Sequence, residues 1–132
     1  MAEHPNVGLV RRAMQAMNEQ DMSKAQQEMA IVDAFMADDI VWHEIGRAEP
    51  RRGKDELRAA MMDGAGGSSI TYAIHDIIAN DDHAIALGSA TATRGDESFE
   101  YRTAEILHIR DGKAVERWAF SDDTAAIAAF FA

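Results

Sequence analysis

The stretch that decides the fold is a predicted β-hairpin near the C-terminus, with the sequence FEYRTAEILHIRDGKAVERWAF over residues 99–120. Phe99–Ile109 reads as a long strand and Ala114–Phe120 as the last strand of the chain. Asp111 and Gly112 stand between them, and both residues tolerate the positive φ angles that a two-residue hairpin turn requires. We therefore predict two antiparallel strands joined by a tight turn.

Two further strands are expected before this hairpin. The run 70–78 has a period of two, and the run 84–93 is made of small residues that a strand tolerates. Short polar turns at 80–82 and 94–96 join these runs to each other and to Phe99–Ile109. Asp123 is placed to cap a short helix at the end of the chain. The second half thus reads as a meander of four strands.

The first half of the chain reads as helical. Val7, Val10, Met14 and Met17 recur at the spacing of one helix face, and Asn6 precedes them as an N-cap.

A second helix follows, with an apolar stripe that ends at Met36. A turn at 38–39 leads into a short strand, Ile40–Ile45, and a third helix covers Lys54–Asp63. Helices segregated from a curved antiparallel meander indicate an α+β fold.

The composition of the chain limits which partners, cofactors and locations we expect for it. The 132 residues carry 23 acidic and 13 basic side chains, a net charge of −10, and no cysteine. Such a charge argues against nucleic acid or an anionic membrane as a partner. No cysteine is present to bind a metal, and the histidines lack metal-site spacing, so we expect neither metal nor cofactor. The N-terminus lacks the features of a signal peptide, which favours a cytoplasmic location.

Three motifs in order carry a resemblance to a known family. They are ADDIVWHE at 37–44, PRRG at 50–53 and RDGKAVERW at 110–118. The chain resembles the SnoaL-like branch of the nuclear-transport-factor-2-like superfamily, which includes ketosteroid isomerases, limonene epoxide hydrolase and polyketide cyclases. The resemblance covers nearly the whole chain and implies a single domain, 1–132. It implies a cone-shaped half-barrel in which a strongly curved, mostly antiparallel sheet wraps about three N-terminal helices around one pocket. It also implies a homodimer through the sheet.

Glu44 is the first candidate for chemistry. The chain from Ala37 to Gly53 is similar without gaps to the ketosteroid isomerase pattern, and Glu44 falls where that family keeps its catalytic aspartate. In a strand, Glu44 shares a face with Trp42, so both would line the cavity. A carboxylate against an indole has a raised pKa, which suits a general base or acid. The alternative is a solvated glutamate at the rim.

Glu105 is the second candidate. It is similar in place to the isomerases' protonated acid, which donates a hydrogen bond to the substrate oxygen. The alternative is a salt bridge across the sheet, to Arg117 or Arg102. Arg117 would otherwise hold an anionic group of a ligand.

Three methionines complete the predicted substrate-binding residues. Met14, Met17 and Met61 would form a pliable pocket wall, or simply fill the core.

The chain also departs from its relatives. Ala13 stands where the isomerases keep their oxyanion tyrosine, and Ala119 stands where the epoxide hydrolases and polyketide cyclases keep an acid in the last strand. Two hypotheses remain open. One is an isomerase-, cyclase- or hydratase-type enzyme that moves a proton on an apolar carbonyl compound. The other is a non-catalytic module that binds a small ligand or dimerises.

Overall fold

The structure is a computed structural model that describes residues 3–18, 22–64 and 68–130, with the backbone alone at 22, 25, 60–64 and 68. The helices there are α1 (Pro5–Met17), α2 (Met22–Phe35), α3 (Lys54–Gly64) and α4 (Thr124–Phe130). The strands are β1 (Met36–Trp42), β2 (Arg51–Arg52), β3 (Ser68–Ala79), β4 (His83–Arg94), β5 (Glu97–Arg110) and β6 (Lys113–Ser121).

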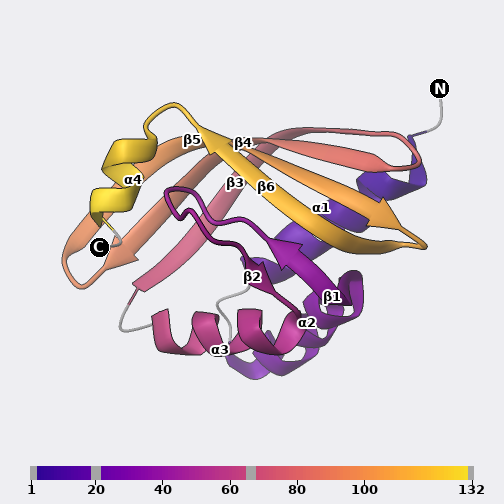
Figure 1. Cartoon of the computed structure of the whole chain (residues 1–132), viewed down its shortest axis with the longest axis horizontal. Helices are drawn as coiled ribbons and strands as arrows, with labels where there is room; N and C mark the ends of the chain where they lie inside the picture. Colours follow the sequence, from indigo (N-terminus) through magenta and orange to yellow (C-terminus); the bar gives the residue numbers. More distant parts are fainter. Residues whose placement is uncertain (1–2, 19–21, 65–67, 131–132) are drawn as a thin grey trace.

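All six strands form one sheet in the order β2-β1-β6-β5-β4-β3. Every neighbouring pair is antiparallel except β1 and β6, which run parallel. Figure 1 shows α1, α2 and α3 on one side of the curved sheet, and α4 at one end beside the turn between β4 and β5. The predicted α+β class and its curved, mostly antiparallel sheet are confirmed.

The β5–β6 hairpin forms as the sequence predicts. Asp111 has a φ of 54° and Gly112 a φ of 75°, so both residues adopt the left-handed conformation. The register shifts by one residue between His108 and Ile109, and beyond this shift Leu107 pairs with Arg117 and Glu105 with Ala119. The shift therefore places the side chains of Glu105 and Arg117 on the same face of the sheet.

The predicted boundary between the second helix and the first strand is wrong. The helical stripe and the turn at 38–39 predict that helix extends through Met36, but α2 ends at Phe35 and β1 begins at Met36. Pairing with β6 decides the outcome, because Met36 lies opposite Ala114 in the parallel ladder. The strand also ends at Trp42 rather than at Ile45, which leaves Glu44 in a loop.

The predicted cap of the first helix is also wrong. His4, not Asn6, is the N-cap, and its ring Nδ1 accepts a hydrogen bond from the Asn6 N–H at 3.1 Å. The Asn6 side chain instead donates to the carbonyl oxygens of Asn80 and Asp81, at 2.9 and 3.3 Å. Asn6 therefore ties α1 to the β3–β4 turn.

A β-bulge interrupts the predicted alternation of β3. Ile74 pairs with Gly88 and Asp76 with Leu87, so His75 is an extra residue. Beyond the bulge the inward positions change from even to odd numbers, and Ile78 is 57% exposed. Gly88 is required there, because a Cβ atom at this position would lie 2.2 Å from the Ala73 carbonyl oxygen.

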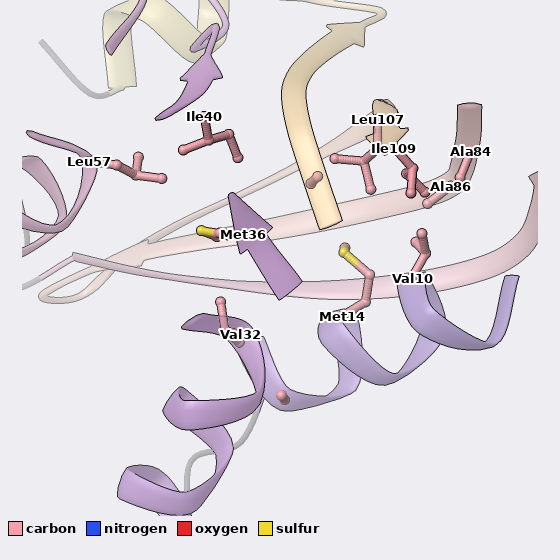
Figure 2. Packing of buried hydrophobic residues seen from close by; sticks show 12 residues of the cluster. Val10, Met14, Val32, Met36, Ile40, Leu57, Ala84, Ala86, Leu107 and Ile109 are labelled. Atoms are coloured by element: carbon pink, nitrogen blue, oxygen red, sulfur yellow. The ribbon is translucent and has the colours of Figure 1, made fainter. Parts of the chain in front are cut away.

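The core lies between the helices and the concave face of the sheet. Figure 2 shows its members reaching this space from α1, α2, α3, β1, β4 and β5. They include Val10, Met14, Val32, Ile40, Leu57 and Leu107. Burying each large apolar side chain contributes roughly 1.5–3 kcal/mol to folding. The core thus holds α1 and α2 against the strands that carry the site.

Candidate functional site

A narrow cavity opens inside this core. Its walls come from α1, α2 and strands β1, β3, β5 and β6, and are almost wholly apolar. The space open to the centre of a water molecule is about 30 Å³, which holds one or two waters. The lining residues are Val10, Ala13, Met14, Met17, Val32, Phe35, Met36, Ile40, Trp42, Tyr72, Glu105, Leu107, Ala114 and Arg117.

A buried ion pair forms the polar part of the cavity wall. Arg117 Nε donates to Glu105 Oε2 at 2.6 Å and Arg117 Nη2 donates to Glu105 Oε1 at 2.8 Å. Glu105 is only 5% exposed and Arg117 only 6% exposed. A two-pronged pair of this kind holds the carboxylate in a fixed orientation. The predicted alternative for Glu105, a salt bridge to Arg117, is confirmed.

Two further contacts hold the Arg117 guanidinium. Its Nη1 donates to the His43 carbonyl oxygen at 2.8 Å, and its guanidinium lies over the Trp42 ring, 4.3 Å from the centroid. Burial lowers the pKa of Arg117, but the charge and hydrogen bonds of Glu105 outweigh burial and raise that pKa above its usual value. Arg117 therefore stays charged and acts as a positioning residue for Glu105.

Tyr72 is a member of the cavity wall that sequence reasoning did not single out. Burial raises the pKa of its phenol, and the negative charge of Glu105 raises it further. The hydroxyl therefore stays protonated as a hydrogen-bond donor. Asn18, at the end of α1, fixes the Tyr72 backbone: its amide accepts from the Tyr72 N–H at 2.8 Å and donates to the Tyr72 carbonyl at 2.6 Å.

Further polar groups lie on the same face of β5 as Glu105. The hydroxyl of Thr103, two residues away, is buried and has no hydrogen-bond partner among the described residues. Burial also raises the pKa of Tyr101, and the charge of Glu105 adds to this rise. An unpaired buried hydroxyl is costly, so a water or ligand oxygen at Thr103 would stabilise this region.

Glu44 is not brought to the cavity. It follows the end of β1, and Arg51 Nε donates to its Oε1 at 2.7 Å. Its side chain is 38% exposed, and it is not among the lining residues. The expectation that Glu44 shares a cavity-facing strand with Trp42 is wrong, because the chain leaves the sheet after Trp42. The catalytic role of Glu44 stays a prediction without support from the cavity.

The remaining site candidates divide in two groups. Trp42, Met14 and Met17 all line the cavity, as predicted. The side chain of Met61 lies outside the described residues. Tyr72 had a sequence signal, since it stands between Ile70 and Ile74 on the inward face of a predicted strand. The sequence pattern does not show that this face of the strand lines the same cavity as Glu105.

The described ranges contain neither a metal-binding cluster nor a membrane-spanning helix. No group of three or more His, Cys, Asp or Glu side chains there is placed to hold a metal ion. No helix within the same ranges is long and apolar enough to cross a membrane.

The curved sheet closed over N-terminal helices around one cavity is the nuclear-transport-factor-2-like architecture. A model of the SnoaL-like domain matches residues 10–117, so the chain belongs to the SnoaL-like domain family. A comparison with curated proteins finds no match.

Solved structures of low sequence identity share the fold. Bal32a, from a soil-derived mobile gene cassette, has a TM-score of 0.79 at 20% identity, covering 96% of each chain. An epoxide hydrolase of M. tuberculosis, similar to limonene epoxide hydrolase, has a TM-score of 0.73 at 17% identity, covering 89% of this chain and 82% of its own. IdmH, a proposed polyketide cyclase of Streptomyces antibioticus, has a TM-score of 0.71 at 18% identity, covering 98% and 100%.

Proposed function

We propose that the chain is an enzyme that binds a small apolar carbonyl compound in this cavity and moves a proton between two of its carbons. The observation that supports this proposal is that the carboxylate of Glu105, paired with Arg117, and a protonated phenol, Tyr72, line the same apolar cavity. Acid–base chemistry needs a proton acceptor and a group that stabilises the charge developing on the substrate. The cavity holds one of each.

The proposed reaction has two steps. Glu105 takes a proton from the carbon beside the carbonyl, and the electrons of that C–H bond move onto the carbonyl oxygen. Tyr72 donates a hydrogen bond to this oxygen while it carries negative charge. Glu105 then returns the same proton to a different carbon. Arg117 keeps Glu105 in place throughout, because its guanidinium is fixed by His43 and Trp42.

This assignment differs from the one that the family resemblance favours. In the proposal, Glu105 is the base and Glu44 is a surface residue. Tyr72, from β3, supplies the hydroxyl that Ala13 of α1 does not. Ala13 and Tyr72 line the same cavity, so a phenol from either element reaches the same space.

Isomerisation of a β,γ-unsaturated cyclohexenone to its conjugated isomer tests the proposal, because conjugation changes the ultraviolet absorbance. Glu105→Gln keeps a hydrogen-bond acceptor for Arg117 but cannot take a proton. We expect its rate to fall by about a hundredfold or more. Circular dichroism must show that the variant is folded. Wild-type rate in the folded variant would contradict the proposal.

The alternative is a module that binds a ligand without turning it over. Its support is that Arg117 occupies both oxygens of Glu105 and that the cavity is small. Binding of prodan, an uncharged naphthyl ketone whose fluorescence reports an apolar surrounding, separates the two. A chain that binds prodan but isomerises no unsaturated ketone would favour the alternative.

We also propose that a second copy of the chain covers the outer face of the sheet. Phe120 is 60% exposed and Ile78 is 57% exposed. Trp118, beside Phe120 on this face, is stacked on His43 with ring centroids 5.7 Å apart. Large exposed apolar side chains on one face are typical of a protein interface. Light scattering of the purified chain would measure the mass of the assembly.

A further inference from the structure

A second and larger hollow lies behind one wall of the cavity. It is a groove between α1 and β3. The space open to the centre of a water molecule is about 430 Å³ in the groove and about 30 Å³ in the cavity. Of these two spaces, which are both lined by described residues, the groove alone has the size of a small-molecule site, which usually spans about 300–1,000 Å³. The cavity therefore cannot hold a whole ligand unless it joins additional space.

The cavity and the groove share a wall. Met14 and Tyr72 line both of them. The backbone of Tyr72 is fixed on both sides by Asn18, at 2.6 and 2.8 Å. The Met14 backbone is held within α1, where its carbonyl oxygen accepts a hydrogen bond from the Asn18 N–H at 3.2 Å, but its side chain is unbranched and adapts its shape easily. A change in the conformation of the Met14 side chain would therefore connect the two spaces.

The two spaces differ in chemistry. The cavity is apolar apart from Tyr72 and the Glu105–Arg117 pair. The groove is lined by the charged side chains of Arg11 and Asp76, the imidazole of His75, and the amides of Gln15 and Asn18. Arg11 is itself paired with Glu3, at 2.7 and 3.0 Å. Its charge is therefore largely compensated. A polar but uncharged group with several hydroxyls suits such a surface, because it both donates and accepts hydrogen bonds.

We propose that the ligand enters through the α1–β3 groove past Met14, and that its uncharged, hydroxylated end stays in the groove while its apolar body occupies the cavity. This inference rests on the proposed function, since it takes the cavity as the ligand site. It assigns to the ligand an elongated form with an apolar part and a polar part.

Two tryptophan substitutions on α1 test the route. Gln15→Trp places an indole in the groove. Leu9→Trp is the control, because Leu9 is 40% exposed on the same helix but does not line the groove. Stopped-flow fluorescence measures how fast prodan binds each protein. We expect the association rate to fall roughly tenfold or more in Gln15→Trp and to stay at the wild-type value in Leu9→Trp.

Displacement of prodan tests the polar half of the site. Hexyl glucoside has an apolar chain and an uncharged hydroxylated head, and hexanol has the same chain without the head. We expect hexyl glucoside to displace prodan from the wild type about tenfold more tightly than hexanol, a difference near 1.4 kcal/mol. This advantage should disappear in Gln15→Trp and remain in Leu9→Trp.

The outcomes separate this inference from the proposed function. Prodan binding at the wild-type rate in folded Gln15→Trp would overturn the route while leaving the cavity as a ligand site. Equal displacement by hexanol and hexyl glucoside would overturn the polar half. Failure of prodan to bind the wild type would reject the cavity as a ligand site, and the proposed function with it.

Discussion

Two of the glutamate–arginine pairs in the described residues, Glu105 with Arg117 and Glu44 with Arg51, have similar geometry but different surroundings. Their shortest N···O distances are 2.6 and 2.7 Å. The side chains of the first pair are 6% and 7% exposed, whereas those of the second are 38% and 23% exposed. The same two residue types therefore make a cavity wall in one place and a surface contact in the other.

Burial is what separates the two pairs in chemistry. Water screens the Glu44–Arg51 pair, and such pairs contribute little to stability. The Glu105–Arg117 pair has lost its water, so each charge depends on its partner and acts strongly on a neighbouring ligand. Similarity to the family directs attention to Glu44, but burial sets Glu105 apart, and this is why we propose Glu105 as the base.

The largest expected effect is a difference between the two pairs in how much each contributes to the free energy of unfolding. Arg117→Met leaves the Glu105 charge buried and unpaired, and we expect a loss of about 3–5 kcal/mol in the free energy of unfolding. Arg51→Met is the matched control, with an expected loss of at most about 1 kcal/mol. Urea unfolding followed by circular dichroism measures both. Equal losses would show that burial does not distinguish the pairs.

A smaller effect concerns the cavity that holds the buried pair, and it is a change in the pH dependence of the free energy of unfolding. An unfolded tyrosine loses its proton near pH ~10, whereas the folded chain keeps Tyr72 protonated to higher pH because the pKa of Tyr72 is raised. Above pH ~10 the unfolded state binds fewer protons than the folded state, so the free energy of unfolding falls as the pH rises. Tyr101 contributes in the same direction. We expect Tyr72→Phe to show a shallower fall than the wild type. An unchanged slope would mean that Tyr72 is not shielded from water.

Local signals predict much of the fold. The Asp111–Gly112 turn predicts the β5–β6 hairpin. Apolar spacing likewise finds α1 and most of α3. These features depend on residues close together in the sequence, or on a single turn, so periodicity suffices to recover them.

Other features depend on contacts between distant segments. Met36 continues a helical pattern, and only its place opposite Ala114 in the parallel ladder makes it a strand residue. The bulge at His75 follows from pairing with β4. In the sequence it is reflected by Gly88, where a larger residue would clash with the Ala73 carbonyl oxygen. Glu44 leaves the cavity because β1 ends two residues earlier. Tyr72, on β3, and Glu105, on β5, line one cavity only because the folded sheet brings their strands together.

The central claim is that Glu105, and not Glu44, moves the proton. The most direct test measures the isomerisation rate of a β,γ-unsaturated cyclohexenone with Glu105→Gln and Glu44→Gln side by side, after circular dichroism shows that both are folded. We predict that Glu105→Gln loses about a hundredfold or more of the rate and that Glu44→Gln keeps the wild-type rate. Loss of the rate in Glu44→Gln with retention in Glu105→Gln would contradict the account.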